Sequence, residues 1–84
     1  MNNKYNIQLI VPSLYKRYDI LIPTNKTVGE TIYLLKEALK ILTKNSYTIE
    51  TNLNLYNATD GSVYELDYFI SETNIKNGSI LVLC

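Results

Sequence analysis

The side chains that usually carry out catalysis are few in this sequence, and their partners are missing. The chain contains no histidine, which is the side chain that most often acts as a general base near neutral pH. Its serines therefore have no histidine to activate them as nucleophiles. One cysteine without histidine cannot form a zinc or iron–sulfur site, and the sequence has no glycine-rich phosphate loop. We therefore expect a protein that is not an enzyme and needs no cofactor or metal.

Two groups of charged side chains could still bind ions. The first is a set of acids that are close in the sequence: Asp60, Glu65, Asp67 and Glu72. They lack the alternating ligand pattern of a calcium loop, so we interpret them as turn and surface residues. The second is a column of lysines at a spacing of four: Lys36, Lys40 and Lys44. This spacing is typical of the solvated side of a helix, although a site for phosphate or acidic groups would show the same pattern.

The composition indicates one small folded domain that spans residues 1–84. Hydrophobic residues make up 46% of the 84 residues, and eight basic side chains balance eight acidic ones. A chain without net charge has no general attraction to nucleic acid or to an anionic membrane. Cys84 has no second cysteine to pair with, which favours a reducing compartment. It could be a reactive thiol at the chain end, but no basic neighbour in the sequence would activate it, so we expect its sulfur to behave as a small hydrophobe. No apolar stretch is long enough for a signal peptide or a membrane-spanning helix, so we expect a cytoplasmic protein without direct membrane insertion.

The first half of the chain predicts a β-hairpin followed by a helix. Residues 5–11 and 17–22 have strand patterns, whose inward faces would carry Ile7, Leu9 and Val11, and Tyr18, Ile20 and Ile22. Thr27 and Glu30 then form a capping box, which marks a helix start. The apolar stripe of this helix consists of Val28, Ile32, Leu35, Leu39 and Leu42. We therefore predict a helix from Val28 to about Thr43. Leu34, Ala38 and Ile41 widen its stripe and could pack under residues 45–51.

The remaining segments read as strands and turns. Residues 52–57 alternate strictly, with Leu53 and Leu55 facing inward and Tyr56 facing outward. Asp60-Gly61 predicts a turn, residues 63–66 a short strand, and residues 67–73 an irregular segment with one helical turn. Asn77-Gly78 predicts another turn, and residues 79–83 form an apolar, β-branched run of strand length.

One mixed sheet with the helix packed across it would bury the apolar faces of both. In the simplest arrangement of these elements, the first and last strands are central and parallel. We therefore predict an α+β protein with a β-grasp fold, in which about five strands pack on one helix.

This pattern resembles that of ubiquitin-like proteins from Tyr5 to Cys84. The resemblance rests on the hairpin, the Thr27-Val28 helix entry, the strand that ends at Tyr56, and the closing stretch from Glu72 to Leu83. Within that superfamily, the length and the absence of a Gly-Gly tail are most similar to the YukD/EsaB family. These are ubiquitin-like accessory components of type VII (ESX/WXG100) secretion in Gram-positive bacteria.

The resemblance implies a non-enzymatic adaptor that acts by protein–protein interaction. Its partners would be secretion-system components, or a second copy in a homodimer. A sulfur-carrier or modifier role is the alternative within the superfamily, but Leu83-Cys84 stand where such proteins carry Gly-Gly. A β-grasp module that binds a small ligand or RNA through the lysine column is a further alternative.

We expect the outer face of the sheet to bind the partner. If Ile80 and Val82 face the core, strand alternation places Leu81 and Leu83 outside. The complete set of predicted partner-binding residues is Tyr56, Leu81, Leu83, Ile10 and Leu21. A helix on one side only should leave the other side of the sheet mostly polar, so apolar side chains there indicate an interaction site. In ubiquitin-like folds this outer face is the usual partner-binding surface.

Overall fold

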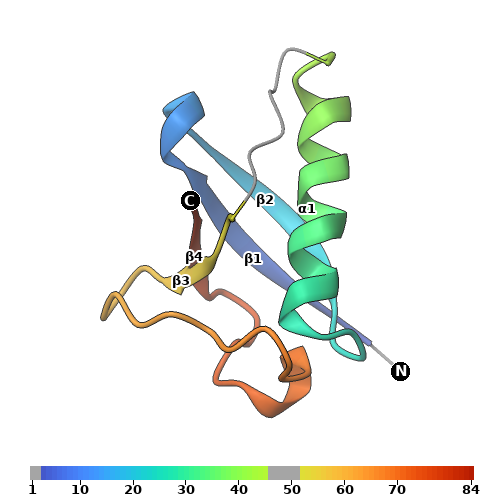
Figure 1. The fold of residues 1–84 in the computed structure, drawn as a ribbon, viewed down its shortest axis with the longest axis vertical. Helices are drawn as coiled ribbons and strands as arrows, with labels where there is room; N and C mark the ends of the chain where they lie inside the picture. Colours follow the sequence, from blue (N-terminus) through green and yellow to red (C-terminus); the bar gives the residue numbers. More distant parts are fainter. Residues whose placement is uncertain (1–2, 46–51) are drawn as a thin grey trace.

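A computed structural model describes residues 3–45 and 52–84. Within these ranges, four strands form one sheet and one α-helix packs on its inner face (Figure 1). The elements in chain order are β1 (Lys4–Val11), β2 (Lys16–Pro23), α1 (Val28–Leu42), β3 (Leu55–Asn57) and β4 (Ile80–Leu83). Short 3₁₀ helices at Pro12–Leu14 and Ile70–Glu72 complete the described secondary structure.

The strand order confirms the β-grasp arrangement. The strands lie in the order β2-β1-β4-β3, so that β1 and β4 are central and parallel to each other. β1 pairs with β2 in an antiparallel hairpin, and β3 pairs antiparallel with β4. The parallel pairing joins strands from the two ends of the described chain, with Leu9 beside Leu81. The sheet is therefore mixed, as we predicted.

The described part of the chain contributes four strands to the sheet, where the sequence predicts about five. In the predicted short strand, residues 63–66, Val63 forms only an isolated bridge with Tyr56. The chain then leaves the sheet because the Leu66 carbonyl oxygen accepts a hydrogen bond from the Gly29 N–H at 3.0 Å. One of the unpaired N–H groups in the first turn of α1 thus gains a backbone partner, and the ladder does not continue.

The helix begins as the sequence predicts. The Thr27 Oγ1 accepts a hydrogen bond from the Glu30 N–H at 3.1 Å, and the Glu30 Oε1 accepts one from the Thr27 N–H at 2.9 Å. The buried members of the stripe are Val28, Ile32, Leu35 and Leu39. Leu42 is the exception, because it is the last helical residue and 53% of its surface is exposed.

The widened stripe on α1 has no described cover. Leu34 and Ile41 are exposed, and Ala38 between them is half-buried. Most of their predicted packing partner, residues 46–51, lies outside the described residues.

The capping box makes the start of α1 sensitive to acid. Hydrogen bonds from Thr27, chiefly from its backbone N–H, hold the pKa of the Glu30 carboxyl below its ordinary value of 4.5. A lowered folded-state pKa stabilises the fold above the unfolded pKa, and this contribution is lost as the pH falls through the folded value. We expect the Glu30→Gln variant to lose less melting temperature than the wild type between about pH 6 and pH 3.

Thermal unfolding followed by circular dichroism measures this difference. Glu65→Gln is the matched control because it removes an exposed carboxylate that lies outside the helix. Equal acid sensitivity of the wild type and the Glu30→Gln variant would show that the capping carboxylate contributes nothing.

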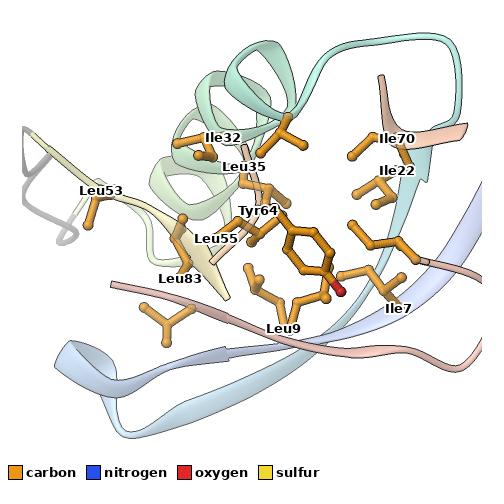
Figure 2. Packing of buried hydrophobic residues seen from close by; sticks show 14 of the residues in the cluster. Ile7, Leu9, Ile22, Ile32, Leu35, Leu53, Leu55, Tyr64, Ile70 and Leu83 are labelled. Carbon is orange, nitrogen blue, oxygen red and sulfur yellow. The ribbon is translucent and has the colours of Figure 1, made fainter. Parts of the chain in front are cut away.

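The hydrophobic core lies between α1 and the inner face of the sheet (Figure 2). From the hairpin, Ile7, Leu9, Val11 and Ile22 are each about 1% exposed or less, as their alternation predicts. Tyr18 and Ile20 are half-buried and pack against the same cluster. The inward positions predicted for the third strand are also confirmed, with Leu55 fully buried and Leu53 8% exposed.

The orientation predicted for the last strand is wrong. Leu81 and Leu83 are 0% and 1% exposed and belong to the core, whereas Ile80 and Val82 are half-exposed on the opposite side. Residues opposite each other on paired strands share a face, and Leu81 lies opposite the buried Leu9. The pairing with β1 therefore fixes the face, and the sequence of β4 alone does not.

Three buried side chains hold the long connection between β3 and β4 against the core: Tyr64, Ile70 and Ile75. The Tyr64 ring points into the cluster (Figure 2), and its hydroxyl donates a hydrogen bond to the Asn74 Oδ1 at 2.7 Å. Burial raises the pKa of the Tyr64 hydroxyl above its ordinary value of 10. The helical turn predicted within residues 67–73 is confirmed by the 3₁₀ helix at Ile70–Glu72.

Candidate protein-binding face

The outer face of the sheet carries a row of apolar side chains that crosses three strands. Ile10 of β1 lies opposite Val82 of β4, and Val82 lies opposite Tyr56 of β3. Val63 continues the row through its bridge with Tyr56. We call these four residues the outer row. The first three are half-buried by their neighbours and Val63 is 51% exposed, so the row presents a continuous apolar strip on the side of the sheet opposite α1.

Polar groups border the outer row at one end and along one side. Arg17 of β2 lies opposite Ile10 and closes one end of the row. The next row of the face holds Asp19, Gln8 and Ile80, and the Arg17 guanidinium donates a hydrogen bond to the Gln8 Oε1 at 3.3 Å. Hydrogen-bonding groups therefore border an apolar centre, which is the usual organisation of a protein–protein interface.

Two open hollows flank Ile80 in the row next to the outer row, and their volumes are about 630 and 470 Å³. Asn77 and Gly78 line both hollows, and Gly78 has a φ of 88°, which favours glycine at this turn. The Asn77 Oδ1 accepts a hydrogen bond from the Asn6 N–H at 2.8 Å, which fixes the turn against β1. Amide side chains therefore line both hollows, including Asn77 in each.

The structure brings together two of the five residues that the sequence predicts for partner binding, and it places a third on the same face. Ile10 and Tyr56 belong to the outer row. Leu21 is 60% exposed on the same face, but it lies opposite Asn6 and is separated from the row. Leu81 and Leu83 do not contribute, because both are buried.

Sequence reasoning missed Val82, Ile80 and Val63 as members of this face. The error at Val82 and Ile80 is one residue of register, which exchanges the two faces of a strand. Val63 carried a usable signal, because a short strand at residues 63–66 next to the third strand would place it beside Tyr56.

The charged groups outside this face show ordinary surface chemistry. Asp60 accepts hydrogen bonds from the Ser62 N–H at 2.9 Å and the Ser62 hydroxyl at 2.8 Å, which lower the pKa of its carboxyl. In the lysine column, the Lys40 Nζ lies 3.9 Å from the Glu37 Oε2, and Lys44 is exposed. Among residues 3–45 and 52–84, no three potential metal-binding side chains gather into a site. The free thiol of Cys84 is exposed.

The described helices include none with the length and apolarity needed to cross a bilayer. No protein-family model matches the chain. The curated proteins contain no match either. Solved structures do match, and one is the ubiquitin-like domain of the Mycobacterium tuberculosis type VII secretion protein EccD1. That domain superposes with a TM-score of 0.74 over 99% of this chain and 98% of its own, at 13% identity.

The chain has a ubiquitin-like fold. A design based on ubiquitin matches with a TM-score of 0.68 over 100% of this chain and 90% of its own, at 20% identity. A chain of the ESX-5 inner membrane complex matches at 0.71 and 10% identity, where this protein covers 99% of itself and 21% of that chain. A chain of a toluene 4-monooxygenase complex matches at 0.76 and 8% identity, over 95% of each. The ubiquitin-like fold thus occurs in type VII secretion components and in an enzyme complex.

Proposed function

We propose that this protein is a cytoplasmic, non-enzymatic accessory component of a bacterial type VII secretion system. It would be a single ubiquitin-like domain of the YukD/EsaB type that binds another protein component of the system. The observation that carries the proposal is the outer row, because it offers an apolar contact surface on a fold that also occurs in EccD1 and in the ESX-5 complex.

The physical case for binding rests on where the outer row lies. A sheet with a helix on one side normally presents polar side chains to water on the other. Here Ile10, Val82 and Tyr56 adjoin across three strands on that side. A contiguous apolar patch of this kind costs free energy while it faces water and gains it when a partner covers it. Tyr56 is the expected anchor, since aromatic side chains with a polar end concentrate binding energy at interfaces.

Secretion of the small WXG100 proteins of the source bacterium tests the proposal. We expect deletion of the gene to stop export of these proteins into the medium, and the wild-type gene to restore it. A gene with Tyr56→Asp and Val82→Asp should fail to restore export, because two buried charges would prevent a partner from covering the outer row.

The control is a variant with Tyr33→Asp and Ile41→Asp on α1. These residues are 63% and 78% exposed and lie on the helix side of the sheet, so this variant should restore export. Circular dichroism and immunoblotting would verify that both variants fold and accumulate. Normal export in the deletion strain would contradict the secretion role, and failure of both folded variants would contradict the choice of face.

A further inference from the structure

Within residues 3–45 and 52–84, β2 presents an open edge of the sheet, because it is the last strand in the order β2-β1-β4-β3. The hydrogen bonds that β1 makes with β4 show which residues of β2 direct their backbone groups away from β1. On β1, the Gln8 N–H donates to the Ser79 carbonyl oxygen at 2.9 Å and the Asn6 carbonyl oxygen accepts from the Gly78 N–H at 2.8 Å. Asn6, Gln8 and Ile10 thus direct their backbone groups toward β4.

The opposite residues on β2 direct their backbone groups outward in the same way. In an antiparallel pair, residues that do not hydrogen-bond each other point their N–H and C=O groups away from each other. Asn6, Gln8 and Ile10 lie opposite Leu21, Asp19 and Arg17. These three β2 residues are exposed, and together they offer a row of backbone donors and acceptors to another extended strand.

The charged side chains of this edge are complementary to those of a second copy of the same edge. If a second β2 pairs antiparallel about a two-fold axis at Tyr18, each Arg17 lies opposite the Asp19 of the second copy. Both side chains lie on the outer face, so one Arg17–Asp19 ion pair forms on each side of the axis. On the inner face the two half-buried Tyr18 rings meet at the axis, in a non-hydrogen-bonded pair where side chains are close.

Neighbouring registers lack this complementarity. A two-fold axis at Asp19 would place the two Asp19 carboxylates opposite each other, and an axis at Arg17 would do the same with two guanidinium groups. An axis at Ile20 would place each Asp19 opposite Leu21 and leave the Arg17 charges unmatched. The sequence of β2 therefore favours pairing with itself in one register.

We propose that two copies of this chain form a homodimer through antiparallel β2–β2 pairing about an axis at Tyr18. The two sheets join into one continuous sheet of eight strands. The axis is perpendicular to the sheet, so both copies of α1 lie on one side and both outer rows on the other. The dimer therefore leaves both outer rows free to bind a partner. The proposed dimer does not depend on a role of the protein in secretion.

Sedimentation equilibrium over a concentration series tests the pairing. The wild type should move from its monomer mass of 9.7 kDa toward twice that mass as its concentration rises. Arg17→Asp and Asp19→Arg, each alone, place like charges opposite each other at both symmetric sites and should weaken the dimer by about tenfold or more. The double variant with both changes restores opposite charges and should dimerise again.

Asp67→Arg is the matched control for these charge reversals. It makes the same change of charge as Asp19→Arg, but at an exposed position in the connection between β3 and β4, so its association should equal that of the wild type. A wild type that stays monomeric at about 1 mM, well above the dissociation constants of specific complexes, would overturn the proposal. Single and double reversals with equal association would overturn the register.

Cysteine cross-linking identifies the axis directly, with Cys84→Ser as the background because its thiol is exposed. Tyr18→Cys would place two thiols across the axis, with Cα atoms about 4.5 Å apart, within the range that a disulfide spans. Ile20→Cys would place them roughly 13 Å apart in the same register, too far to bridge. Rapid oxidation to a dimer is expected only for Tyr18→Cys. The reverse result would overturn the axis at Tyr18.

Discussion

Replacing Leu81 with alanine is expected to lower the free energy of unfolding by about 3 kcal/mol. Leu81 is fully buried on the central strand β4, opposite the equally buried Leu9. Removal of its side chain beyond Cβ loses apolar contact and leaves a cavity that a rigid sheet cannot close. Because a small domain is stable by only roughly 5–15 kcal/mol, a loss of this size is a large fraction of the total. Urea denaturation followed by circular dichroism measures it.

Val82→Ala is the matched control for this prediction. Val82 is the next residue on the same strand, but it is half-exposed on the outer face. Its truncation should cost less than about 1 kcal/mol, since water already contacts part of the side chain. If Val82→Ala destabilises the protein more than Leu81→Ala, the register of β4 against β1 is different from the one described here.

Replacing Tyr64 with alanine is expected to cost about 3 kcal/mol or more, comparable to the loss of other large aromatic side chains. The ring is 9% exposed and brings the long connection between β3 and β4 into the core. Tyr64→Phe separates the two contributions of the side chain. It retains the ring and removes only the hydrogen bond to the Asn74 Oδ1, so it should cost about 1 kcal/mol.

Hydrogen exchange would locate the damage. With Tyr64→Ala, the amides of residues 58–79 should lose protection first, because this connection contains little regular structure and depends on its buried side chains. Uniform loss of protection over the whole described chain would contradict this and show that the connection unfolds only together with the sheet.

The parts of the fold that the sequence predicted well depend on short-range signals. The capping box at Thr27 and Glu30 needs only three residues of separation, and the helix start is correct. In β1, polar residues up to Gln8 alternate with the apolar positions Ile7, Leu9 and Val11. This alternation predicts directly which face of the strand is buried. The first and last strands were placed side by side because burying all the apolar faces leaves few arrangements.

The candidate site was harder to predict, because its key strand has no internal pattern. All four residues of β4, from Ile80 to Leu83, are apolar, so alternation does not distinguish the inner from the outer face. The choice is made by hydrogen bonds to β1 from a segment some 70 residues away in sequence, such as the one that joins Gln8 to Ser79. Tyr56 and Ile10 were found because each directly follows a leucine that the alternation places inside, Leu55 and Leu9.

The parallel pairing of β1 with β4 also determines the order in which this protein can fold. Gln8 pairs with Ile80, so this contact closes a loop that includes most of the chain. During synthesis, β1, β2 and α1 can collapse together early, since their contacts are local. The edge of β1 that pairs with β4 nevertheless stays unpaired until β4 has left the ribosome. The nascent chain therefore exposes this strand edge until β4 has been synthesised, which is the interval in which chaperones would protect it from aggregation.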